Sequence, residues 1–107
     1  MHRLTAAIFC AAVFLSLPAA AQEHPYITTD WADLDVGQSA CLDRAERAIA
    51  KNGFRSPGTT KNSRHGIRGS YTVAVRCAAD KGFVFFIVAG PSGEQTEKYE
   101  VSIKNDF

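Results

Sequence analysis

Two segments in the second half of the chain show the apolar patterns of β-strands. In residues 70–77 apolar side chains occupy every second position, which places them on one face of a strand: Tyr71, Val73, Val75 and Cys77. Residues 83–89 are apolar at every position, which is typical of an inner strand covered on both faces. Asp80, Lys81 and Gly82 between them predict a tight hairpin turn closed by the glycine.

Residues 39–52 show the period of a helix instead. Their apolar side chains recur at the spacing of one helical face: Cys41, Leu42, Ala45, Ala48 and Ile49. Ser39 is a suitable N-cap, because its hydroxyl can accept a hydrogen bond from an amide of the first turn. Gly53 follows directly and can adopt the left-handed conformation that ends many helices. We therefore predict a helix from Ser39 to Asn52.

Three other segments carry weaker patterns. We predict a short strand over residues 26–29, and we interpret residues 30–35 with their three aspartates as a turn region before the helix. Residues 51–69 contain four glycines and one proline, and we predict that most of them form an exposed loop.

The C-terminal segment fits two structures. Residues 99, 101 and 103 alternate as in a strand, whereas Ser92 and Gln95 fit the capping box of a helix. We predict a helix over residues 92–107, because a helix would cover one face of the apolar strand at residues 83–89.

Together these elements predict an α+β fold in the order β-α-β-β-α, with a small antiparallel sheet and helices packed on one face. The chain shows no internal repeat and no low-complexity run. We expect residues 22–107 to form a single small domain.

Residues 1–21 have the order of a secretory signal peptide. Arg3 precedes an uncharged apolar run that ends at Pro18, and Ala19 and Ala21 supply the small residues of an A-x-A cleavage site. An uncleaved anchor is the alternative, since residues 4–21 are just long enough to cross a bilayer as a helix. We favour cleavage after Ala21, and hence a periplasmic or secreted protein with no stable membrane insertion.

Two cysteines remain after this cut, Cys41 and Cys77. An even pair in a short exported chain predicts one disulfide bond. In the predicted fold both side chains face the interface between helix and sheet, which agrees with a bond between them.

Most of the mature chain resembles small uncharacterised exported proteins of proteobacteria. Three segments carry the resemblance: Cys41-Leu42-x-Arg44-Ala45, Tyr71-x-Val73-x-Val75-x-Cys77 and Gly82-Phe83-Val84-Phe85-Phe86-Ile87-Val88-Ala89-Gly90-Pro91. These motifs form core and turns, so the resemblance implies a fold and brings no established activity.

A basic stretch is the first candidate binding site. Residues 51–79 contain six Lys or Arg residues and no Asp or Glu, although eleven basic and eleven acidic residues balance in the chain once residues 1–21 are removed. Such a segment can hold an anionic envelope component or an acidic protein face, or it can simply be solvated. The candidate residues are Arg55, Lys61, Arg64, His65 and Arg68.

The new N-terminus is the second candidate. Gln22, Glu23 and His24 would supply an amine, two backbone amides and an imidazole, a nitrogen set that suits copper or nickel. The alternative is an ordinary exposed terminus, and cyclisation of Gln22 would remove the amine.

Catalytic motifs are missing from the sequence. It contains no Gly-x-Ser-x-Gly, no His-Glu-x-x-His and no P-loop. We therefore expect a non-catalytic binding or interaction module with no cofactor and an envelope component or a protein as partner. The compartment argues against nucleic acid, and the oligomeric state is open. The alternative function is copper or nickel binding through residues 22–24.

Overall fold

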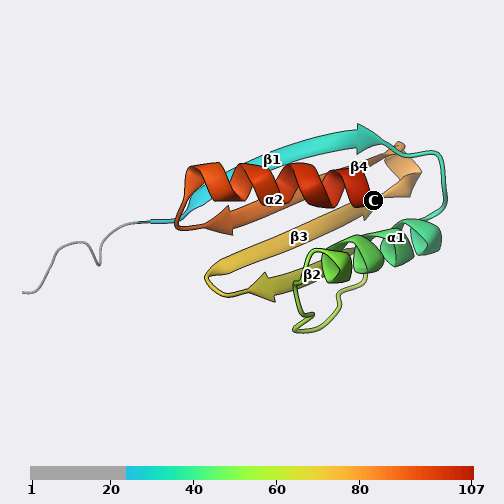
Figure 1. The fold of residues 1–107 in the computed structure, drawn as a ribbon. Coiled ribbons are helices and arrows are strands. Elements are labelled where there is room, and N and C mark those ends of the chain that lie inside the picture. The colour runs from blue at the N-terminus through green and yellow to red at the C-terminus, as the bar shows by residue number, and fades with distance from the viewer. Residues whose placement is uncertain (1–23) are drawn as a thin grey trace, which may run out of the picture.

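A four-stranded antiparallel sheet carries both helices on one of its faces in the computed structural model, which describes residues 24–107 (Figure 1). The strands lie in the order β1-β4-β3-β2. Their bounds are β1 Tyr26–Asp33, β2 Ser63–Arg68, β3 Tyr71–Ala78 and β4 Phe83–Gly90, and the helices are α1 Gln38–Lys51 and α2 Gly93–Asp106. The predicted α+β fold with helices on one face is confirmed. The predicted signal peptide and residues 22 and 23 lie outside the described residues.

The core lies between the two helices and one face of the sheet. Alternate residues of β3 and β4 point into it and are fully or almost fully buried: Val73, Val75, Cys77, Val84, Phe86 and Val88. The predicted apolar face of α1 is buried against them. The Sγ atoms of Cys41 in α1 and Cys77 in β3 form the predicted disulfide, which joins α1 covalently to the sheet.

The predicted helices are confirmed with small shifts at their ends. α1 begins one residue earlier than predicted, so Gly37 is its N-cap and Ser39 lies inside the first turn. Gly53 has a φ of 82°, the left-handed conformation expected after the helix. At α2 the Ser92 hydroxyl accepts a hydrogen bond from the Gln95 amide, as a capping residue does. The short 3-10 helix η2 (Ala79–Lys81) and Gly82 make the predicted tight connection between β3 and β4.

The interpretation of residues 51–69 as mostly an exposed loop holds for residues 52–62 but was wrong for residues 63–68. Residues 63–68 form β2, the edge strand that pairs with β3. The two arginines of β2 lie on its helix-facing side, where polar side chains masked the strand pattern, and Gly66 is buried beneath α1. The sheet therefore has one strand more than predicted.

The first strand is longer than the predicted residues 26–29. β1 continues to Asp33, so Asp30 and Asp33 lie in the strand and not in a turn. Asp30 lies on the helix-facing side of β1. Its charge is compensated there, because the ammonium of Lys104 in α2 lies 2.8 Å from its carboxylate.

β4 is an inner strand as predicted, but it is covered on one face only. The side chains of Phe83, Phe85 and Ile87 point away from the helices, and no helix or strand within residues 24–107 packs against them. A strand that is apolar at every position was expected to be buried on both sides, and this expectation was wrong.

Candidate functional site

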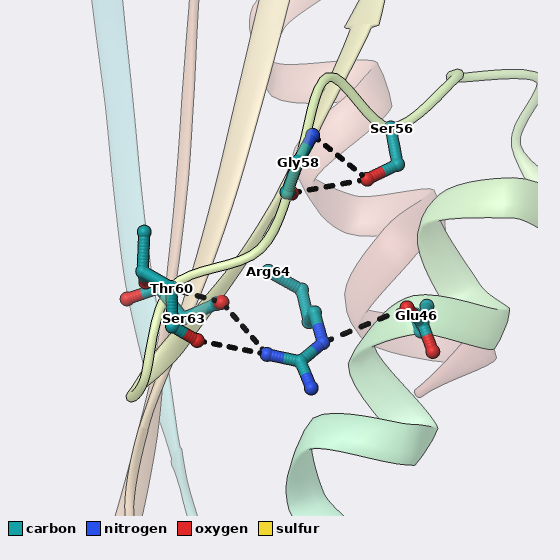
Figure 2. Close-up of polar contacts among 6 residues, drawn as sticks. All are labelled: Glu46, Ser56, Gly58, Thr60, Ser63 and Arg64. Carbon is teal, nitrogen blue, oxygen red and sulfur yellow. Dashed lines mark hydrogen bonds and ion pairs between the residues drawn. The ribbon is translucent and has the colours of Figure 1, made fainter.

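Arg64 is one of the predicted anion-binding residues, and its guanidinium is engaged within the fold. One Nη1 atom donates hydrogen bonds to the carbonyl oxygens of Thr60 at 2.9 Å and Ser63 at 3.1 Å (Figure 2). Its Nε atom lies 3.6 Å from the carboxylate of Glu46 in α1, and only 18% of the side chain is exposed. Arg64 therefore fixes the turn before β2 against the helix.

Arg68 is engaged in the same way at the other end of β2. Its Nη1 atom donates a 2.7 Å hydrogen bond to the carbonyl oxygen of Asn52, the residue that ends α1. The guanidinium also lies over the ring of Tyr99 in α2, 5.3 Å from its centre. These contacts join the end of α1, the edge strand and α2, so the charge is used within the fold.

The other predicted basic residues differ in accessibility. Arg55 and Lys61 are exposed on the connection from α1 to β2, and His65 is half-buried on β2. The loop between them closes on itself, since the Ser56 hydroxyl donates to the Gly58 carbonyl and accepts from the Gly58 amide (Figure 2). The structure therefore does not gather the five predicted residues into one site.

A different group of cations lines a shallow hollow of about 430 Å³ beside the disulfide. Lys61 contributes from the connection, Arg76 from β3 and Lys81 from η2. The side chain of Gln38 fixes this corner, because its amide donates to the Cys77 carbonyl at 2.9 Å and its oxygen accepts from the Ala79 amide at 3.0 Å. Within residues 24–107 neither Lys61 nor Arg76 makes an ion pair, so two of the three cations are available to an anion.

The most extensive candidate surface is the side of the sheet opposite the helices, which we call the open face. Directly paired residues of neighbouring strands point to the same side. The register therefore defines its members on the first three strands: Ile27, Thr29, Trp31 and Asp33 on β1, Phe83, Phe85, Ile87 and Ala89 on β4, and Thr72, Ala74, Arg76 and Ala78 on β3. At the far edge β2 adds Ser63, His65 and Ile67.

Large apolar side chains on the edge strand β1 and the inner strand β4 of the open face contact solvent. Ile27 is 65% exposed, Trp31 55% and Phe85 38%. Trp31, Phe83 and Phe85 line an apolar hollow of about 260 Å³, in which the two phenylalanine rings meet edge to face at 4.9 Å. A binding surface of this kind rests on aromatic anchors that are already held in place by the strands.

Sequence reasoning missed this surface, although a signal was present. Residues 26–33 contain Tyr26, Ile27, Trp31 and two threonines, residue types that are enriched in strands. The three aspartates favoured the interpretation of residues 30–35 as a turn, and a turn has no second face to consider.

A buried acidic group lies on the opposite side of β1. Glu100 of α2 is almost fully buried, and its Oε2 atom has no hydrogen-bond partner among the described residues. Burial raises the pKa of Glu100, and the nearby carboxylate of Asp30 raises it further. The pKa of Asp30 is lowered by the hydrogen bond from Lys104 and by the backbone amide of Trp31.

The predicted copper or nickel site falls mainly outside the described residues, because these exclude Gln22 and Glu23. His24 is exposed at the start of the described chain. Within residues 24–107 no group of three or more His, Cys, Asp or Glu side chains is placed to hold a metal ion. The metal hypothesis stays a prediction.

No protein-family model matches the chain, and no curated protein matches it. The resemblance to exported proteins of proteobacteria stays a prediction. Among the helices that the structure describes, none is both long and apolar enough to cross a membrane.

Proposed function

We propose that this protein is a non-catalytic binding module of the cell envelope that holds a protein partner on the open face of its sheet. One observation carries the proposal: an aromatic and aliphatic surface held by the strands is exposed, whereas the other face of the same sheet is covered by the two helices and contains the core.

The size of the open face supports a binding role. Strands lie about 4.8 Å apart and rise about 3.4 Å per residue, so four strands of up to eight residues present roughly 500 Å² on one side. The large apolar residues lie mainly on β1 and β4, about half of this area, which is close to the lower end of the roughly 300–600 Å² that the largest apolar patch of a typical monomeric protein covers. Contact between apolar surface and water is unfavourable. A partner that covers this surface therefore gains binding free energy from the hydrophobic effect.

An exported location is part of the proposal. The Cys41–Cys77 bond supports it, because disulfides persist in oxidising compartments outside the cytoplasm. The signal-peptide pattern of residues 1–21 supports it independently.

Site-specific cross-linking in cells tests the proposed surface. A photoreactive side chain at Thr29 lies on the open face, and the same side chain at Glu97 lies on the exposed side of α2 as the matched control. We expect a discrete cross-linked species from Thr29 and none from Glu97. Equal cross-linking from both positions, or none from Thr29, would contradict a binding role for the open face.

The basic hollow supports a second candidate function, the binding of an anionic envelope component. Lys61, Arg76 and Lys81 meet there beside a corner fixed by Gln38. We expect Lys61→Gln/Lys81→Gln to weaken binding to vesicles containing phosphatidylglycerol. The difference in affinity between this variant and the parent protein should become smaller as salt is added. Lys51→Gln/Lys98→Gln removes the same charge from exposed lysines elsewhere and serves as the control. Equal binding by both double variants would refute an anion site in the hollow.

A further inference from the structure

We infer that the occupant of the open face is a second copy of this chain, packed sheet against sheet about a two-fold axis. This inference rests on the proposed role of the open face and names its partner. In the resulting dimer the two sheets would form the inner layers and the helices the outer layers.

The shape of the surface favours another sheet. The open face spans neighbouring strands without a bulge between the paired residues of β1, β4 and β3, so it is an extended pleated surface. Proteins cover such faces with helices or with a second sheet about 10 Å away, whose side chains interdigitate with the first. The helices of this chain already cover the opposite face.

The arrangement of charge on the open face is complementary to itself. Phe85 pairs with Trp31 on one side and with Arg76 on the other, so these three side chains form one row across the sheet. A two-fold axis along β4 exchanges β1 with β3. It therefore places Arg76 of one copy opposite Trp31 of the other, an arrangement in which a guanidinium meets an indole ring.

The neighbouring row strengthens this match. Asp33 pairs with Phe83, and it lies two residues, or about 7 Å, from Trp31 along β1. The same axis brings Asp33 of one copy close to Arg76 of the other. Within residues 24–107 neither Asp33 nor Arg76 makes an ion pair, and they lie on strands separated by β4. One acid and one base, each without a partner in its own chain, thus complement each other across the axis.

Two further quantities agree with a second copy. The chain without residues 1–21 is formally neutral, so two copies do not repel each other through net charge. The axis along β4 overlaps β1, β4 and β3 of the two copies, so each copy buries roughly 400 Å², about 800 Å² in total. This is the area of weak, transient complexes. We therefore expect a weak, reversible dimer.

Sedimentation equilibrium of the purified, disulfide-bonded protein tests the inference. Phe85→Asp should weaken dimerisation at least tenfold, because the axis along β4 places residue 85 of one copy opposite residue 85 of the other, so two carboxylates would meet at the centre of the interface. Val101→Asp should leave it unchanged, since Val101 is 52% exposed on α2, away from the open face. A parent protein that stays monomeric to millimolar concentration, or two variants with equal effects, would overturn the inference.

A charge swap makes the test specific to the proposed axis. Arg76→Glu and Asp33→Arg should each weaken the dimer, because each places like charges together across the interface. The double variant should restore most of the affinity, and a double variant as weak as the sum of the two would refute this axis. Circular dichroism checks that each variant is folded.

The two proposals fail in different ways. A monomer in solution whose Thr29 position still cross-links to a different protein in cells would refute the second copy and leave the binding role intact. A monomer whose open face instead becomes protected by lipid vesicles would refute a second copy as well.

Discussion

Gly66 shows at the scale of one residue how closely β2 and α1 pack. A β-carbon at this position would lie 2.5 Å from Cγ2 of Ile49 and 2.7 Å from Cβ of Phe54, both closer than carbon atoms approach in proteins. The absence of a side chain therefore lets the helix lie directly on the edge strand.

We predict that Gly66→Ala lowers the free energy of unfolding by about 1–3 kcal/mol, the usual cost of overpacking a core. Urea denaturation with the disulfide intact measures it. Gly37→Ser is the control, because a β-carbon at Gly37 meets nothing within 4 Å and serine is a good N-cap. Equal stability of Gly66→Ala and the parent protein would contradict the packing of β2 beneath α1.

Glu100 provides a prediction on pH. Its pKa is raised in the folded protein, first by burial and then by Asp30, so keeping it ionised in the fold costs free energy. This cost is absent below the ordinary pKa of 4.5, where the carboxyl is protonated in both the folded and the unfolded state, and it grows as pH rises above that value.

We therefore expect Glu100→Gln to unfold at higher denaturant concentration than the parent protein at pH 7, with the difference closing below pH 4.5. Glu97→Gln, at an exposed position of the same helix, should show a much smaller change, because Glu97 contributes least to the raised pKa of Glu100. A variant that is less stable than the parent by the same amount at both pH values would show that the buried carboxylate carries no penalty.

At the scale of elements, the sequence predicts best where one pattern has one physical cause. The apolar face of α1 was predicted residue by residue, because a buried helix face has a single period and clear ends. β2 was missed, since Arg64 and Arg68 use their charges against backbone carbonyls and this use leaves no trace in composition. The open face was missed for a different reason. Apolar residues on both sides of β4 predict burial of both faces, and the pattern does not show whether this chain supplies an element to cover each face.

The disulfide joins two elements that are distant in sequence, and its loss should be costly. Cys41 and Cys77 are 36 residues apart, and closing such a loop stabilises the fold by about 3–4 kcal/mol in the chain-entropy model. We expect Cys41→Ser/Cys77→Ser to lower the free energy of unfolding by that amount, measured by urea denaturation. If the reduced parent and the variant were as stable as the oxidised protein, the bond would have no role in holding α1 to the sheet.

At the scale of the whole molecule, the two faces of the sheet divide the protein into a covered half and an uncovered half. The covered half contains the helices, the disulfide and the buried carboxyl group of Glu100. The uncovered half presents apolar side chains flanked by Asp33 and Arg76. We therefore assign stability to the covered half and binding to the uncovered half.

Trp31 tests this division most directly, because it is the only tryptophan of the chain and lies on the open face. Its fluorescence emission reports whether water contacts the indole ring, and it requires no substitution. Over a dilution series of the purified protein, we predict emission at shorter wavelength when the protein is concentrated and a shift to longer wavelength on dilution, as the two open faces separate. Emission at the wavelength of a solvent-exposed tryptophan at every concentration would contradict the pairing of open faces.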